Sequence, residues 1–164
     1  MTSDGDLADI RRIREVVLGY CRGIDRLDPT LVRATFHPDA VVDYGVFKGP
    51  AAQFADAVVP FMRRRYAGTM HNITNDVVEV AGDIAHTEFY FVAYHRLDEG
   101  SGRELETFAG RYVDRFERRD GSWRVVHRVV VHEWSNRRPL GEGFPGADQF
   151  AKPRPAPDDE AYRR

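Results

Sequence analysis

Several features that define other protein classes are missing from this chain of 164 residues. Cys21 is its only cysteine, so no disulfide can form within the chain and a reducing compartment is compatible with the sequence. No apolar run approaches membrane-spanning length, and residues 1–6 show no sign of a signal peptide. The formal net charge of −2 gives no electrostatic reason to expect nucleic acid or a membrane as partner. We therefore expect a cytoplasmic protein.

The motifs of several chemistries are also absent. The sequence contains no His-Glu-x-x-His, no paired cysteines, no glycine-rich phosphate loop and no Gly-x-Ser-x-Gly elbow. We therefore expect neither a metal nor a cofactor. What is present is an ordinary globular composition, 42% hydrophobic and 30% charged, in a chain long enough for one domain with its own core.

The first part of the chain has the period of helices and the second part the period of strands. Asp28-Pro29 is a helix-start signal, and Pro60 should kink or restart the helix that contains it. The expected helices cover residues 7–24, 29–36 and 51–62, and a turn at residues 37–39 precedes a brief strand at 41–44. The expected long strands cover residues 70–80, 84–97, 104–117 and 123–134, with a hairpin loop at 98–102.

Helices followed by long antiparallel strands predict an α+β domain. We expect three N-terminal helices packed on a strongly curved, mostly antiparallel sheet, as a cone-shaped α+β barrel with a pocket inside. This domain covers residues 1–134, and residues 135–164 form a Pro-rich C-terminal tail. Phe144 and Phe150 suggest that the tail docks on the body or on a neighbouring subunit, and a disordered tail is the alternative.

Asp25 and His71 are the most informative pair. Asp25 ends the first helix, and His71 begins the first long strand. A carboxylate at the C-terminal end of a helix opposes the helix dipole, which favours a functional role for Asp25. A carboxylate that accepts a hydrogen bond from one imidazole nitrogen leaves the other nitrogen free as a base. Tyr44, His95 and Arg128 lie on neighbouring elements and are candidates to stabilise developing negative charge.

Each of these residues also has a structural interpretation. His71 is then a strand histidine bonded to backbone, His95 is solvent-exposed, and Tyr44 is a core tyrosine. Arg128 lies on a strand face that looks buried, where it needs an anionic partner. Asp25, Asp114 and a ligand carboxylate are the candidates for that partner.

Six short motifs occur in a characteristic order over residues 7–134. They are Gly-Tyr-Cys-Arg-Gly-Ile-Asp-Arg-Leu-Asp, Phe-His-Pro-Asp-Ala, Phe-Lys-Gly-Pro, Met-His-Asn-Ile-Thr-Asn, Gly-Asp-Ile-Ala and Arg-Arg-Asp-Gly-Ser-Trp-Arg. In this order the chain resembles the nuclear transport factor 2-like superfamily, in its SnoaL-like branch. The resemblance implies the cone-shaped fold and a homo-oligomer, either a trimer or a dimer.

Within that branch the chain is similar to the scytalone dehydratase and hexachlorocyclohexane dehydrochlorinase families, which perform eliminations with an Asp–His dyad. The resemblance carries that dyad to Asp25 and His71. It gives pocket roles to Tyr44, His95 and Arg128. The chain departs from those families at Tyr20, Ile24 and Tyr112, so the groups that recognise a particular substrate do not all carry over.

The sequence therefore predicts a cofactor-free lyase that dehydrates a small, mostly apolar cyclic substrate, with His71 as general base oriented by Asp25. The expected pocket wall consists of Tyr20, Phe54, Phe89, Phe91, Phe108 and Tyr112. One alternative is a non-catalytic ligand-binding or scaffold subunit, such as the small subunit of a ring-hydroxylating dioxygenase. Another is an isomerase or cyclase, similar to ketosteroid isomerases and polyketide cyclases, that uses an aspartate as base.

Overall fold

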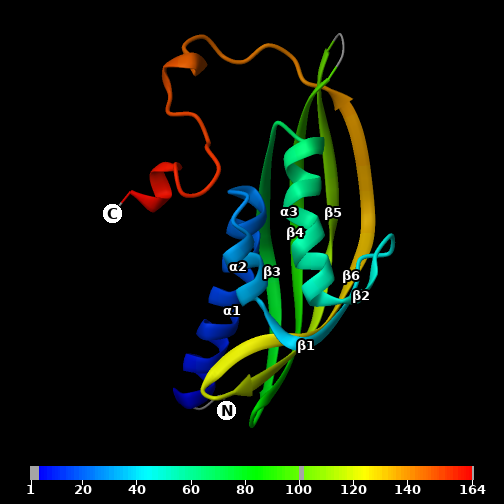
Figure 1. Cartoon of the computed structure of the whole chain (residues 1–164), viewed down its shortest axis with the longest axis vertical. Helices are drawn as coiled ribbons and strands as arrows, with labels where there is room; N and C mark the ends of the chain where they lie inside the picture. Colours follow the sequence, from blue (N-terminus) through cyan, green and yellow to red (C-terminus); the bar gives the residue numbers. More distant parts are fainter. Residues whose placement is uncertain (1–3, 100–101, 164) are drawn as a thin grey trace.

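The computed structural model describes residues 4–99 and 102–163, which form three α-helices on one face of a six-stranded sheet (Figure 1). Two short 3-10 helices, η1 (Ala147–Gln149) and η2 (Glu160–Tyr162), follow in the C-terminal segment. The helices are α1 (Asp4–Asp25), α2 (Pro29–Ala34) and α3 (Ala51–Arg65). The strands are β1 (Phe36–Asp43), β2 (Lys48–Pro50), β3 (Gly68–Ala81), β4 (Ile84–Glu99), β5 (Gly102–Arg119) and β6 (Ser122–Pro139). The predicted α+β class is confirmed. The hairpin loop predicted at 98–102 falls partly on residues 100 and 101, outside the described residues.

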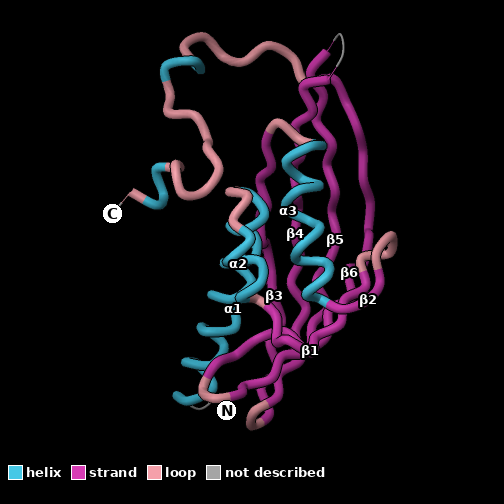
Figure 2. The backbone as a smooth tube through the Cα atoms, viewed as in Figure 1, coloured by secondary structure: helices cyan, strands magenta, loops and turns pink. Residues whose placement is uncertain are grey.

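The sheet is mixed but mostly antiparallel. Its strand order is β2-β1-β6-β5-β4-β3, and only β1 and β6 run parallel to each other. Extra residues in β3 between Ile73 and Asp76, and in β6 between His132 and Trp134, shift the register and bend the long strands. The strands curve around the helices (Figure 2), yet β2 and β3 remain as two edges. The curved sheet is therefore confirmed, whereas a closed barrel does not form.

The amphipathic face of α1 provides much of the core. Ile13 and Val17 are fully buried, and Ile24 is almost so. At the start of α2, Asp28 is the N-cap and accepts hydrogen bonds from two backbone N–H groups, as the Asp-Pro signal predicts. None of the helices in the described part of the chain combines the length and apolar character needed to cross a membrane.

The structure corrects the turn expected at residues 37–39 and, of the two outcomes expected at Pro60, the restart of the helix. The turn expected at residues 37–39 is instead part of β1, whose pairing with β6 shifts register between Phe36 and Val41. Pro60 lies within α3 and the helix continues past it, with Val59 and Met62 buried on either side. Packing on both sides of the proline thus holds the helix together despite the missing N–H.

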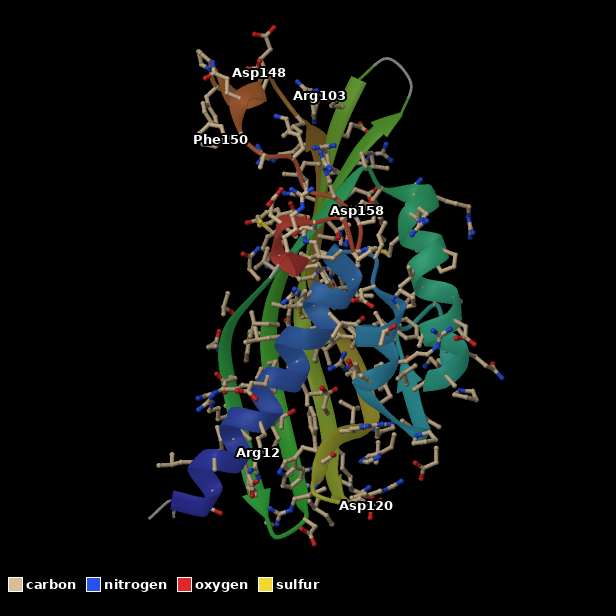
Figure 3. The ribbon with its side chains drawn as sticks, turned by 60° about the vertical axis from the view of Figure 1, so that its left-hand side comes forward. Arg12, Arg103, Asp120, Asp148, Phe150 and Asp158 are labelled. Atoms are coloured by element: carbon tan, nitrogen blue, oxygen red, sulfur yellow. The ribbon has the colours of Figure 1, made fainter. Side chains whose placement is uncertain are left out.

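The C-terminal segment docks on the end of α1, but not through the residues expected. β6 runs beyond residue 134, and the chain then returns so that the Ala156 N–H bonds the Arg26 carbonyl at 2.6 Å and Tyr162 bonds Asp28 at 2.8 Å. Phe144 and Phe150 pack on each other and are each 65% exposed. Figure 3 shows Phe150 away from the helices. Backbone hydrogen bonds and Tyr162 therefore hold the tail, whereas the sequence pattern had indicated Phe144 and Phe150.

Candidate functional site

A cavity of about 510 Å³ lies between α1, α3 and the sheet face that they cover. Its floor is buried, with Tyr20 and Tyr112 only 3% and 2% exposed, whereas Val46 and Phe61 at its mouth are 102% and 48% exposed. Of the residues predicted for the site, the structure brings these to the cavity wall: Tyr20, Tyr44, Phe54, His71, Phe91, His95, Phe108 and Tyr112. It does not bring Asp25, Phe89 or Arg128 to that wall.

Asp25 lies directly behind His71. The His71 Nδ1 atom is 2.7 Å from Asp25 Oδ1, and the His71 backbone N–H donates to Oδ2 at 2.9 Å. Both side chains are nearly buried, at 7% and 10% exposure. The end of α1 and the start of β3 are thus joined through one carboxylate.

The protonation state of Asp25 decides the tautomer of His71. Burial raises the pKa of Asp25, but hydrogen bonds from His71 and Thr69 outweigh burial and lower that pKa below its usual value. The carboxylate is therefore ionised and only accepts hydrogen bonds, so the proton between the two groups is on His71 Nδ1. His71 Nε2 then carries the free lone pair of a base, and His71 lines the cavity.

Thr69 and Tyr66 complete this region and were not predicted from the sequence. The Thr69 hydroxyl donates to Asp25 Oδ1 at 2.8 Å. Tyr66 lines the cavity, packs against His95 with tilted rings whose centroids are 4.7 Å apart, and donates to Glu106 at 3.1 Å. A signal for Thr69 existed, because residues two apart on a strand point to the same face.

His95 is a neutral neighbour of His71. The two rings meet edge to face, with centroids 5.6 Å apart. Burial lowers the pKa of His95 to about 4, and the nearby His71 contributes in the same direction. Among residues 4–99 and 102–163, no group of three His, Cys, Asp or Glu side chains is arranged to hold a metal ion.

Arg128 lies behind the cavity wall, in a buried ion pair. It forms two hydrogen bonds with Asp114, at 2.8 and 2.6 Å, and both side chains are fully buried. Its guanidinium group lies over the rings of Tyr20 and Tyr112, at 4.6 and 4.3 Å. Of the partners considered for Arg128, the structure selects Asp114, and Arg128 does not line the cavity where a ligand contact was expected.

A chain of hydrogen bonds connects this ion pair to the cavity. Arg128 donates to the Tyr44 hydroxyl at 3.4 Å, and Tyr44 donates to the Tyr20 hydroxyl at 2.8 Å. Within the described chain the Tyr112 hydroxyl has no hydrogen-bond partner, although Tyr112 lines the cavity. Burial raises the pKa of all three tyrosines, so each hydroxyl is a neutral donor at neutral pH. Tyr20 and Tyr112 therefore have protons to donate to a ligand.

The aromatic wall of the cavity is formed mainly by β4 and β5. Phe91 stacks on Tyr112 at 4.2 Å and on Phe108 at 5.7 Å. Phe89 faces the same side of β4 as Phe91 and is buried in the core, but it does not line the cavity. The expectation that Phe89 lines the pocket is therefore wrong. Alternation along a strand identified its face, whereas the packing of the core decides how far the cavity extends.

A smaller space of about 90 Å³ lies on the other side of Asp25. Its lining includes Asp25 and Thr69, and residues 153–155 of the C-terminal segment cover it. The segment thus lies between solvent and the polar side of the Asp25–His71 pair. This placement was not expected from the sequence, because the contact joins positions far apart in the chain.

The family model of the SnoaL-like domain matches residues 5–129. The chain belongs to the SnoaL-like family. The matched part of this SnoaL-like protein contains the Asp25–His71 pair, the Arg128–Asp114 pair and every residue of the cavity lining except Val130. No curated protein matches the chain in a sequence comparison.

Solved structures with the same fold include enzymes of different kinds. A hexachlorocyclohexane dehydrochlorinase (LinA, type 2) has a TM-score of 0.70 at 25% identity, covering 92% of this chain and 99% of that chain. A proposed scytalone dehydratase from Novosphingobium aromaticivorans has a TM-score of 0.73 at 20% identity, covering 91% and 99%. A proposed aromatic-ring hydroxylase from the same species has a TM-score of 0.71 at 19% identity, covering 82% and 94%. The SnoaL-like neighbours thus include lyases, but the fold alone does not select a reaction.

The buried ion pair predicts an asymmetric response to mutation. Asp114→Ala leaves the Arg128 charge buried without a partner, so we expect the free energy of unfolding to fall by about 3–5 kcal/mol. The neutral double variant Asp114→Leu/Arg128→Met should recover most of this loss. Urea unfolding measures both, and Asp56→Ala, which breaks the exposed pair with Arg33, is the control with an expected loss of at most about 1 kcal/mol. Equal losses for the single and double variants would contradict the interpretation.

The lowered pKa of His95 predicts a pH dependence of stability. The unfolded chain binds this proton near pH 6.5, whereas the folded protein resists it until about pH 4. Stability therefore decreases as pH falls through that window. NMR of the His95 ring should show titration near pH 4 in the wild type, and a higher pKa in His71→Gln, where repulsion by a charged His71 is removed. Titration of His95 near pH 6.5 in both proteins would refute its burial beside His71.

Proposed function

We propose that this protein is a lyase that eliminates water from a small, mostly apolar cyclic substrate without a cofactor. The observation that carries the proposal is the Asp25–His71 hydrogen bond at the wall of an apolar cavity. Asp25 holds the proton on Nδ1, so Nε2 is available as a base next to the space where a ring fits. A carboxylate and an imidazole arranged in this way supply a general base at neutral pH.

In the proposed reaction His71 Nε2 takes a proton from the carbon next to a carbonyl group. The electrons of the C–H bond form the new carbon–carbon double bond, and the hydroxyl group on the adjacent carbon leaves. The proton held by His71 passes to the departing hydroxide, so water is released and the imidazole returns to its neutral form. Asp25 stabilises the imidazolium in between, and general-base action of this kind contributes ~10²- to 10⁴-fold in rate.

Neutral hydroxyl donors stabilise the charge that develops on the carbonyl oxygen. Tyr20 receives a hydrogen bond from Tyr44, which receives one from Arg128, so the Tyr20 proton is directed to the ligand. Tyr112 is a second donor at the cavity floor. Each pre-organised donor of this type is worth ~3 kcal/mol in the transition state. Tyr44 and Arg128 then act through Tyr20, and His95 forms part of the wall as a neutral group.

A second candidate is a non-catalytic ligand-binding or scaffold subunit, for which an apolar cavity lined by aromatic side chains is also suited. Such a subunit needs no base, so His71→Ala would not change its function. An isomerase or cyclase with Asp25 as base is a third candidate. It predicts that Asp25→Asn reduces activity as strongly as His71→Ala, whereas in the proposed lyase Asp25→Asn retains part of it. Cytoplasmic location and a dimer or trimer remain predictions.

The test is turnover of cyclic β-hydroxy ketones, followed by the ultraviolet absorbance of the conjugated product. We expect His71→Ala to lower the rate by about 10²-fold or more, with a nearly unchanged melting temperature, because only the base is removed. His86→Ala is the matched control, since His86 is an exposed strand histidine that does not line the cavity. Equal activity of His71→Ala and wild type, or loss of folding in His71→Ala, would refute the assignment.

A further inference from the structure

The charges around the cavity are distributed unevenly. Asp25 lies behind His71, and within the described residues no Asp or Glu lines the cavity. His95 is neutral because its pKa is about 4. Arg64 of α3 lines the cavity and is the only arginine or lysine that does so in the described part of the chain. Its positive charge therefore faces the cavity with no carboxylate on the wall to neutralise it.

Arg64 lies at the mouth of the cavity. It is exposed, as are Val46 and Phe61 of the same rim, whereas the floor residues Tyr20 and Tyr112 are buried. The cavity thus has an apolar interior with neutral hydroxyl donors at the bottom and one cation where it meets solvent. This arrangement is complementary to an amphiphilic ligand whose apolar ring lies inside the cavity and whose negatively charged end stays in water.

Within the described residues, Arg64 differs from its neighbours Arg63 and Arg65 because it lines the cavity and has no partner. Arg65 pairs with Glu106 at 3.3 Å. For Arg64, by contrast, the described residues provide no hydrogen bond, ion pair or aromatic partner. Arg63 is also exposed and unpaired within the described residues, but it does not line the cavity. Arg64 is therefore free to bind an external anion, and Arg63 is a matched residue on the same helix.

We propose that the ligand carries a carboxylate on its ring system and that Arg64 binds this carboxylate at the cavity mouth. This substrate class rests on the proposed function, because the ring must lie beside His71. The guanidinium group offers paired N–H donors that match a carboxylate, and the ion pair would fix which edge of the ring reaches the base. The substrate is then an amphiphilic ring acid, where the sequence alone predicted only an apolar ring.

The test compares two fluorescent probes that differ in one anionic group. They are 1-anilinonaphthalene-8-sulfonate and its neutral analogue N-phenyl-1-naphthylamine, titrated into the full-length wild type, Arg64→Gln and Arg63→Gln. We expect Arg64→Gln to weaken binding of the sulfonate about five-fold and to leave the neutral probe unchanged. Arg63→Gln should leave both dissociation constants within about two-fold of wild type. Equal weakening of both probes, or equal effects of the two substitutions, would overturn the proposal.

The variant Ala57→Trp tests whether the probes bind inside the cavity. Ala57 is exposed on α3 and lines the cavity, so a tryptophan there should block both probes without disturbing the core. Full retention of sulfonate binding in this variant would put the anion elsewhere and overturn the assignment. Probe binding is measured without turnover, so it tests the role of Arg64 independently of the lyase activity. If the probes behave as expected while His71→Ala retains wild-type turnover, the proposed lyase activity is refuted and anion binding by Arg64 is not.

Discussion

The hydrogen bond between Asp25 and His71 determines how the candidate site is organised, because it joins the end of α1 to the start of β3. A carboxylate at the C-terminal end of a helix is electrostatically unfavourable. Here three donors compensate for that cost, namely the His71 ring, the His71 backbone and the Thr69 hydroxyl. The same donors fix the carboxylate, the carboxylate fixes the imidazole, and the imidazole presents Nε2 toward the cavity. The orientation of the His71 ring and the position of its proton therefore both depend on Asp25.

The second polar cluster is kept away from the ligand. Arg128 and Asp114 neutralise each other inside the protein, and the rings of Tyr20 and Tyr112 separate the guanidinium from the cavity. Its charge still reaches the cavity indirectly, through the hydrogen bond to Tyr44 and from there to Tyr20. His71 on the wall and the neutral hydroxyl donors on the floor are arranged as the proposed proton transfer requires. Among the described residues, Arg64 at the mouth is the one arginine or lysine that lines the cavity.

Local patterns were sufficient for much of the fold. Helical period, the Asp-Pro start and strand alternation placed the helices and long strands, and they put Asp25 and His71 at the ends of elements that meet. Alternation also gave the correct face for Phe89, but not its depth, which the packing of the core determines. The predicted strands at 104–117 and 123–134 form a hairpin in which Asp114 lies opposite Arg128, so the sequence offered a local signal for this ion pair among its candidate partners. The docking of residues 153–162 depends on contacts between distant positions, and the sequence offers no local pattern for it. Where a side chain such as Arg128 has several candidate partners, its actual partner is known only from the folded structure.

The most direct test of the account is the tautomer of the His71 ring, measured by ¹⁵N NMR at neutral pH in the wild type and in Asp25→Asn. The account predicts a proton fixed on Nδ1 in the wild type. In Asp25→Asn, loss of the anionic acceptor should release this preference and populate the Nε2-protonated form. The same tautomer mixture in both proteins, typical of an unconstrained histidine, would contradict the claim that Asp25 prepares His71 as a base.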